Sequence, residues 1–202
     1  MAFLSGTQRM RDALLSLVAE DAVSMPLLAA EALPPLLAAA EGLSYRTGRR
    51  EISSGEKAVR QDFDICMAPP KQNPLWDLAA ELEEHLARAL AGLRPPLLAG
   101  RLGLNDLVVQ RYHAGSFGIT AHRDHVRYTG LVALVQLSGD GRFFVSDTRS
   151  DPGAREIAWR SGDLLLMRAP GFAGRKDRPF HFLSDIATER YSVGLRHDTQ
   201  PS

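Results

Sequence analysis

The spacing of apolar residues predicts helices over most of the first hundred residues. Between 74 and 92 leucines recur every three or four positions, and Asn73 and Pro74 precede the run, as is typical of a helix start. A shorter repeat near the N-terminus predicts another helix, and Pro26 and the pair Pro34–Pro35 divide the Ala/Leu-rich stretch 25–43 into short helices. The apolar positions of the two repeats are Met10, Leu14, Leu15 and Val18, and then Leu75, Leu78, Leu82, Leu86, Leu90 and Leu93.

The segment 45–66 has a different pattern, in which polar and apolar residues alternate. Val59, Phe63 and Ile65 are separated by Arg60 and Asp64 among other polar residues, so successive side chains differ in character. Side chains alternate between the two faces of a strand, and this pattern therefore predicts extended strands with one polar face.

After Gly100 the chain changes to short β-rich runs, each closed by Gly, Asp, Ser or Pro. Eight such runs, about ten residues apart, favour a sandwich or barrel, and an eight-stranded jelly roll fits the count. The predicted strands are 106–112, 117–123, 130–137, 142–147, 155–159, 163–168, 179–183 and 190–197. We therefore expect an α+β protein with a double-stranded β-helix (jelly roll) core and N-terminal helices packed against it.

This pattern also predicts how the chain is organised. Residues 1–100 would form a helical N-terminal region, with a strand pair at 45–66 and a supporting helix at 74–92. Residues 101–202 would form the jelly-roll core. The length suits one compact domain that contains both parts.

Composition and charge exclude several classes of protein. Lys+Arg and Asp+Glu are both 24, so the net charge is zero and binding to nucleic acid through charge alone is not expected. The one cysteine, Cys66, permits no disulfide framework and is expected to be buried. The sequence has no signal-peptide pattern and no apolar run long enough to span a membrane, so we expect a cytoplasmic protein that does not contact a membrane.

Two arginines fall on one face of the last predicted strand. By the alternation of side chains, Arg190, Ser192 and Arg196 point one way, together with Gly194, and the intervening apolar residues point the other way. Arginine forms paired hydrogen bonds with carboxylates and phosphates, so this face could bind an anion. A solvent-facing strand with two surface arginines is the alternative that this strand alone leaves open.

A possible metal site follows from two other predicted strands. His122 and Asp124 project to the same side at the end of the second strand, and His181 lies on the seventh, which can be its neighbour in a jelly roll. Two imidazoles and one carboxylate on one side of a metal form the facial triad of non-haem iron(II) oxygenases.

Four sequence segments resemble the AlkB-type branch of the 2-oxoglutarate- and iron(II)-dependent oxygenases. They are VVQRYHAGSFGITAHRD, WRSGDLLLM, RPFHF and ERYSVGLR, in the family's order, within residues 105–197. The resemblance implies Fe(II), 2-oxoglutarate and O2 as cofactor and co-substrates, and a reaction that hydroxylates or demethylates. It also implies iron ligands at His122, Asp124 and His181, and 2-oxoglutarate contacts at Arg190, Tyr112 and Arg196.

The chain departs from the family at three positions. Gln110 stands where the family usually has asparagine, and Ser192 where it often has asparagine; both can still hydrogen-bond 2-oxoglutarate. Val126 stands where the repair enzymes carry an acidic residue that helps to read a damaged base.

The substrate is the least constrained part of the prediction. Arg60, Asp62, His125 and Arg127 are candidate substrate contacts, and the two arginines could form a pocket for an anion together with Arg49 and Arg50. A small-molecule or peptide substrate is favoured and a nucleic acid is possible. The alternatives from other classes are a non-catalytic, cupin-like metal- or ligand-binding module and a zinc hydrolase. The sequence leaves the oligomeric state open.

Overall fold

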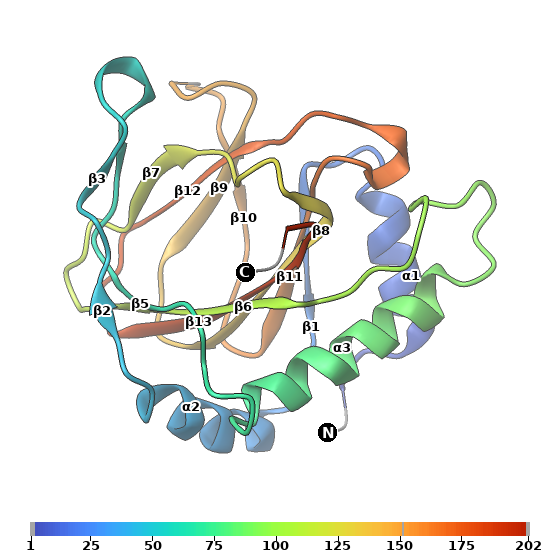
Figure 1. Cartoon of the computed structure of the whole chain (residues 1–202), viewed down its shortest axis with the longest axis horizontal. Helices are drawn as coiled ribbons and strands as arrows, with labels where there is room; N and C mark the ends of the chain where they lie inside the picture. The colour runs from blue at the N-terminus through green and yellow to red at the C-terminus, as the bar shows by residue number, and fades with distance from the viewer. Residues whose placement is uncertain (1–2, 151, 201–202) are drawn as a thin grey trace.

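Two antiparallel sheets face one another in the computed structural model, which describes residues 3–150 and 152–200 (Figure 1). The major sheet has seven strands in the order β1-β11-β8-β13-β6-β5-β2, and the minor sheet has four in the order β10-β9-β12-β7. A separate hairpin is formed by β3 (Glu51–Ile52) and β4 (Val59–Arg60).

The eight runs predicted after Gly100 are eight strands of the structure, β6 to β13. In chain order they alternate between the major and the minor sheet, except that the consecutive strands β9 and β10 both lie in the minor sheet. Their bounds are β6 Asp106–Tyr112, β7 Ile119–His122, β8 Tyr128–Ser138, β9 Arg142–Ser146, β10 Arg155–Ile157, β11 Asp163–Arg168, β12 Phe180–Ser184 and β13 Arg190–Asp198. The predicted jelly-roll core is confirmed.

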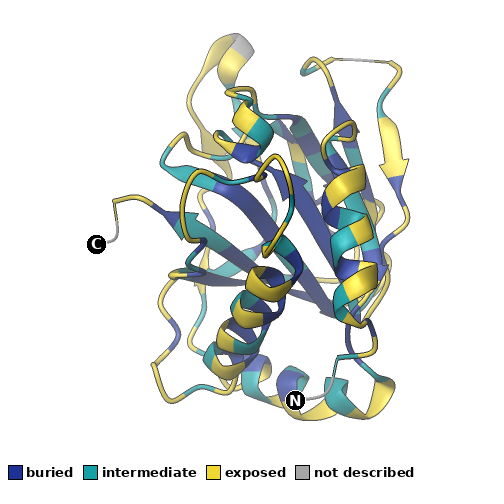
Figure 2. Ribbon diagram, turned by 90° about the vertical axis from the view of Figure 1, so that its right-hand side faces the viewer, coloured by how far each residue is buried: buried dark blue, intermediate teal, exposed yellow. Residues whose placement is uncertain are grey.

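Three helices cover the outer face of the major sheet: α1 (Thr7–Ser16), α2 (Leu33–Glu41) and α3 (Leu75–Leu90). Their buried side chains form one apolar cluster with residues on that face, among them Val193 and Leu195 of β13. Figure 2 shows the helices buried toward the sheet and exposed on the other side. A second cluster, which includes Tyr112, Phe143 and Trp159, fills the space between the sheets.

The helix predicted at 74–92 is α3, although Leu90 and Leu93 of its stripe are only partly buried and Leu93 lies beyond the helix end; the stripe predicted for α1 is partly wrong. The leucines at 75, 78, 82 and 86 are fully buried, as the stripe predicted. In α1 only Met10 and Leu14 of the predicted stripe are buried; Leu15 and Val18 are exposed, and Leu17 lies in the core instead. The helix ends at Ser16, so the helical period does not extend to Val18. None of the helices within the described ranges is long and apolar enough to cross a membrane.

The N-terminal hundred residues also contribute strands to the major sheet: β1, which the pattern did not predict, and β2 and β5, which lie within the strands predicted at 45–66. β1 (Ala22–Pro26) pairs with β11 at one edge of the major sheet, and β2 (Arg46–Thr47) and β5 (Asp64–Cys66) extend the other edge beside β6. The predicted boundary at residue 100 therefore separates no layer of the fold. Cys66 is buried, as expected.

The single strand pair predicted at 45–66 is divided between two places. β5 joins the major sheet, whereas β4 lies beside β7, the edge strand of the minor sheet. The chain crosses between them at Gln61 and Asp62, where Gln61 bridges to Ile119 and the Asp62 N–H donates to the Gly118 carbonyl at 2.8 Å.

Gly118, whose carbonyl accepts from Asp62, also lies against the backbone of Leu183, and Gly115 offers a matched control for a substitution there. Both have positive φ, +83° and +81°, so alanine costs about 1–3 kcal/mol of folding free energy at either position. A Cβ at Gly118 would lie 1.9 Å from the Leu183 carbonyl oxygen, whereas one at Gly115 would meet no atom within 4 Å. We predict that Gly118→Ala lowers the free energy of unfolding by about 1–3 kcal/mol more than Gly115→Ala does, because its Cβ has no room. Urea denaturation of the two variants measures the difference. Equal losses would contradict the close approach of the Gly118 and Leu183 backbones.

Candidate metal centre and arginine pocket

The structure brings His122, Asp124 and His181 together at one end of the space between the sheets. His122 ends β7 and His181 lies on β12, and the two residues are directly paired in the antiparallel register. One side-chain atom from each of the three residues lies within 4.8 Å of the other two, and the imidazole centroids are 4.2 Å apart. This cluster is the arrangement that the sequence predicted.

Hydrogen bonds orient the two imidazoles. The Nδ1 atom of His122 lies 3.0 Å from the Thr120 carbonyl oxygen, and that of His181 lies 3.5 Å from the Pro179 carbonyl oxygen. A carbonyl only accepts, so each Nδ1 carries the proton and each Nε2 keeps a free lone pair, as metal-binding histidines require.

The electrostatics of the cluster also suit a divalent metal. Burial lowers the pKa of His122 to about 3, with a further contribution from His181, and burial likewise lowers the pKa of His181. Burial alone would raise the pKa of Asp124, but Arg196 and the two histidines together hold it below its ordinary value. At neutral pH the cluster therefore presents two neutral imidazoles and one carboxylate, the donor set of a facial triad.

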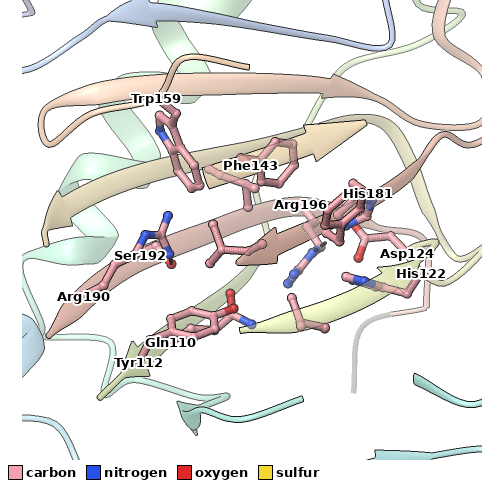
Figure 3. A pocket seen from close by; sticks show the side chains of 14 residues that line it. Gln110, Tyr112, His122, Asp124, Phe143, Trp159, His181, Arg190, Ser192 and Arg196 are labelled. Atoms are coloured by element: carbon pink, nitrogen blue, oxygen red, sulfur yellow. Dashed lines mark hydrogen bonds and ion pairs between the residues drawn. The ribbon is translucent and has the colours of Figure 1, made fainter. Parts of the chain in front are cut away.

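A cavity of about 450 Å³, including its mouth, extends from these residues between the sheets (Figure 3). Its far end is formed by Arg190 of β13 and by Tyr112 of β6, which are paired in the register. The residues that line the cavity are Gln110, Tyr112, Ile119, His122, Asp124, Leu134, Phe143, Trp159, His181, Phe182, Leu183, Arg190, Ser192 and Arg196. All five predicted 2-oxoglutarate contacts are in this set.

Arg190 is a buried cation that forms no ion pair with any carboxylate of the described residues, although the more distant charge of Asp140 helps to keep it ionised. Its side chain is 1% exposed and donates to the Ser192 hydroxyl at 3.2 Å and to Gln136 Oε1 at 3.5 Å. The guanidinium lies 4.5 Å from the Trp159 ring centroid and 5.4 Å from that of Tyr112. Within the described ranges it forms no ion pair with a carboxylate, and its Nε has no hydrogen-bond partner. Burial lowers its pKa only to about 10, so it stays charged at neutral pH.

Arg196 lies at the metal end of the cavity, not beside Arg190. Its Nη1 donates to Asp106 at 3.1 Å, and its Nε lies 3.8 Å from Asp124 Oδ2. Burial lowers the pKa of Arg196, but Asp124 and Asp106 outweigh that effect and raise it. Arg196 therefore keeps Asp124 ionised while it lines the cavity.

The other predicted 2-oxoglutarate contacts surround Arg190. Gln110 pairs with Ser192 in the register, two residues along the strands from the Tyr112–Arg190 pair. Tyr112 is 2% exposed, and burial raises the pKa of its hydroxyl to about 12, so the hydroxyl is a neutral donor. These side chains offer hydrogen-bond donors around the guanidinium.

The predicted substrate residues lie outside the cavity. Arg60 is exposed on β4 over the Phe117 ring, and Asp62 is held by its backbone at the crossing to β5. His125 is exposed, and its Nδ1 accepts from the Arg127 N–H at 3.3 Å. The guanidinium of Arg127 already pairs with Asp198 at 3.2 Å and donates to the Tyr128 hydroxyl, and its contact with a substrate stays a prediction.

Three residues at or beside the cavity were not predicted from the sequence as part of the site: Gln136, Phe143 and Trp159. Gln136 is 1% exposed and is the polar residue in the otherwise apolar run of β8, a signal that could have identified it. Phe143 packs against His181, with centroids 5.8 Å apart, and against Trp159 at 5.6 Å. No periodicity indicates that these two rings face the cavity.

Comparisons with known proteins give a fold but no close relative. No protein-family model and no curated protein matches the chain. Among solved structures, a prolyl hydroxylase of Trichoplax adhaerens in complex with a hypoxia inducible factor peptide matches with a TM-score of 0.69, 13% identity and coverage of 95% of this chain and 90% of that one.

Two bacterial structures are similar to a comparable degree. A prolyl-4-hydroxylase of Pseudomonas putida has a TM-score of 0.66 and 15% identity, with 94% and 98% of the two chains covered. A 2OG-Fe(II) oxygenase family protein of Burkholderia pseudomallei has a TM-score of 0.65 and 15% identity, with 95% and 90% covered. The chain thus has the fold of these oxygenases, whereas the AlkB-type branch stays a prediction.

We predict that His122→Ala, Asp124→Ala and His181→Ala each abolish binding of Co(II) at micromolar concentration, because each removes one of three donors. Isothermal titration calorimetry without any co-substrate measures this directly. His113→Ala removes a histidine that is exposed and paired with Asp64, and serves as the control that keeps wild-type affinity. Full metal affinity in any of the three ligand variants would remove that residue from the site.

Proposed function

We propose that this protein is a 2-oxoglutarate- and Fe(II)-dependent dioxygenase that hydroxylates or oxidatively demethylates its substrate, with succinate and CO2 as co-products. The observation that supports this most strongly is the pairing of two features in one cavity. A two-histidine, one-carboxylate cluster forms one end, and a buried, carboxylate-free arginine forms the other. A dicarboxylate can bind a metal at the cluster through one end and pair with the arginine through the other, so it accounts for both features.

The residues have separate roles in this proposal. His122, Asp124 and His181 would hold Fe(II), and Arg190 would bind the distal carboxylate of 2-oxoglutarate, with a hydrogen bond from Tyr112. Iron and 2-oxoglutarate, when bound, supply the oxidation of a substrate C–H bond by O2. The protein's own share is to fix the co-substrate, keep Asp124 ionised through Arg196, and exclude water.

The lining of the cavity suits that last task. Leu134, Phe143 and Trp159 form an apolar wall between the two charged ends, and Phe143 and Trp159 are buried. In such a surrounding an arginine–carboxylate pair is stronger than in water, because the dielectric is low.

Two other classes of function explain fewer of these observations. A cupin-like binding module would need the metal ligands but no buried arginine at the far end. A zinc hydrolase would need a general base beside the metal, and Asp124, itself a ligand, is the only carboxylate among the residues that line the cavity. The oxygenase accounts for both ends.

For the substrate we favour a peptide or a small molecule. The structural neighbours include prolyl hydroxylases, one of them in complex with a peptide. Val126 is 59% exposed beside the metal-binding turn and cannot accept a hydrogen bond from an exocyclic amine of a base. A zero net charge also gives a long nucleic acid little nonspecific attraction.

We predict that Arg190→Ala raises the KM for 2-oxoglutarate at least about tenfold, because a charge-assisted bidentate pair in a dry pocket contributes about 2 kcal/mol or more. The affinity for Fe(II) should change little, since Arg190 lies at the opposite end of the cavity. The assay is succinate release against 2-oxoglutarate concentration. A larger effect from Arg196→Ala on this KM would mean that the two arginines have exchanged roles.

The substrate prediction is tested by one turnover comparison. Proline-containing peptides, amino acids and anionic metabolites are set against methylated single-stranded oligonucleotides, with succinate and modified product measured together. We expect coupled product from the peptide or metabolite arm. Rapid demethylation of the oligonucleotides, with no coupled product from the other arm, would assign the protein to nucleic-acid repair.

A further inference from the structure

Two arginines from distant loops donate to the backbone on either side of the His122–Asp124 pair. Arg149 Nη1 donates to the carbonyl of Ala121 at 2.5 Å, immediately before His122. Arg178 Nη1 donates to the carbonyl of Asp124 itself. We call Arg149 and Arg178 the backbone-binding arginines.

The strand that they contact is short, and its support beyond β12 comes from the Gln61–Ile119 bridge and from hydrogen bonds between Thr120 and Arg60. β7 is four residues long, lies at the edge of the minor sheet, and its register with β12 shifts between the His181 and Leu183 positions. Asp124 lies beyond the end of the strand, where no sheet hydrogen bonds position it. Two of the three candidate metal ligands therefore lie at or beyond the end of a short edge strand, where side chains of Arg149 and Arg178 donate to the backbone.

Arg149 reaches this strand across the metal end of the minor sheet. It follows β9 in a turn that the Ser146 hydroxyl closes on the Thr148 carbonyl at 2.9 Å, and its guanidinium lies 5.4 Å from the ring centroid of Phe180, the neighbour of His181. The same Nη1 that contacts Ala121 also donates to the Ala58 carbonyl at 3.1 Å. Arg149 thus joins the loop before β4 to the strand that ends in His122.

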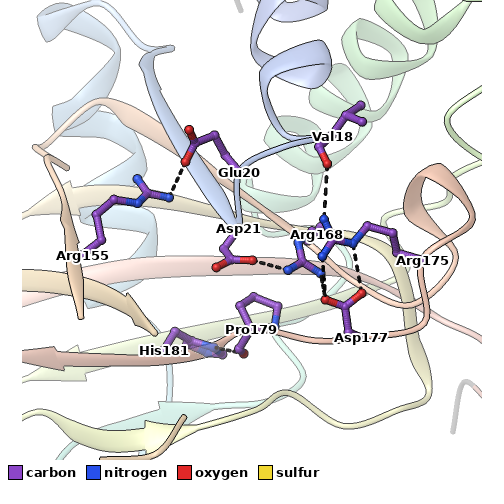
Figure 4. A network of polar contacts seen from close by, with 9 residues as sticks. All are labelled: Val18, Glu20, Asp21, Arg155, Arg168, Arg175, Asp177, Pro179 and His181. Atoms are coloured by element: carbon purple, nitrogen blue, oxygen red, sulfur yellow. Dashed lines mark hydrogen bonds and ion pairs between the residues drawn. The ribbon is translucent and has the colours of Figure 1, made fainter. Parts of the chain in front are cut away.

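Arg178 is anchored from the opposite side. The residue before it, Asp177, binds Arg168 and accepts hydrogen bonds from Arg175 at 3.0 and 3.1 Å (Figure 4). Arg168 is 6% exposed and also binds Asp21, so the segment that leads into β12 is held to the end of β11.

We propose that Arg149 and Arg178 are positioning residues that set the geometry of His122 and Asp124 for metal binding; this inference rests on the proposed function of the site. Neither side chain lines the cavity, so each acts through the backbone carbonyl that it binds. Outer contacts that orient metal ligands typically change metal affinity by about 10–100-fold when they are removed.

The test compares Arg149→Ala, Arg149→Lys and Arg178→Ala with Arg142→Ala. Arg142 is the matched control, because it lies on β9, stacks over Phe144 at 5.0 Å and pairs with exposed Glu156, but does not contact β7. Co(II) affinity and the visible spectrum of the bound Co(II) are measured without co-substrate. The ratio of modified product to succinate is measured with it, and thermal unfolding is followed for every variant.

We expect Arg149→Ala and Arg178→Ala to weaken Co(II) binding by about 10-fold or more, change the Co(II) spectrum, and lower the ratio of product to succinate. Arg149→Lys should restore most of the affinity, because one nitrogen makes both bonds of Arg149 and an ammonium has three donors. If Arg149→Ala does not fold, the Co(II) affinity and spectrum of Arg149→Lys still test the role of Arg149.

The proposal would be overturned if well-folded Arg149→Ala and Arg178→Ala kept the wild-type Co(II) affinity and spectrum. It would also be overturned if Arg142→Ala lost as much affinity, or if Arg149→Lys restored none. Wild-type protein that binds Co(II) through the triad but does not turn over 2-oxoglutarate would refute the proposed function alone, since the metal measurements still judge the two arginines. Wild-type protein that binds no metal would refute both.

Discussion

The buried charge of Arg190 is the constraint on which the interior of this protein depends. Moving an ion out of water costs several kcal/mol even after relaxation, and proteins normally recover that cost with a counter-charge. Here the guanidinium has a hydroxyl, an amide oxygen and two aromatic rings around it, and within the described part of the chain it forms no ion pair, although the charge of Asp140 acts on it from farther away. Hydrogen bonds and ring contacts reduce the cost without removing it, so an anionic ligand gains affinity from completing the site.

The strand β13 connects this charge to the rest of the fold. Arg190, Ser192 and Arg196 line the cavity, and Tyr191, Val193 and Leu195 pack in the core beneath the helices. The same alternation that places a cation in the cavity therefore also holds the helical layer to the sheet. At the metal end, Arg196 is neutralised by Asp106 and Asp124, so the two arginines of one strand have opposite electrostatic roles.

Much of this arrangement could be predicted because it depends on a period of two. The eight strands after Gly100, the pairing of His122 with His181, and the inward face of β13 all follow from alternation and from the order of strands in a jelly roll. The strand β1 was not predictable in this way, because an edge strand of five residues between two helical segments is too short to show a period of its own.

Contacts between distant loops were also beyond the reach of the sequence. Arg127 and Arg149 lie in polar segments, where the sequence predicts exposed side chains. In the structure Arg127 pairs with Asp198, and Arg149 binds the backbone of β7. Their partners are 71 and 28 positions away in the chain, and no local pattern records such a separation. The same holds for Trp159, whose ring closes the cavity over Arg190.

The central claim is that the charge of Arg190 is completed by the distal carboxylate of a metal-bound dicarboxylate. A crystal structure with Mn(II) and 2-oxoglutarate, prepared without oxygen, measures this most directly. The account predicts Mn(II) bound by His122, Asp124 and His181, and a distal carboxylate within hydrogen-bond distance of the Arg190 guanidinium and the Tyr112 hydroxyl. A carboxylate bound elsewhere, with Arg190 still unpaired at saturating 2-oxoglutarate, would contradict it.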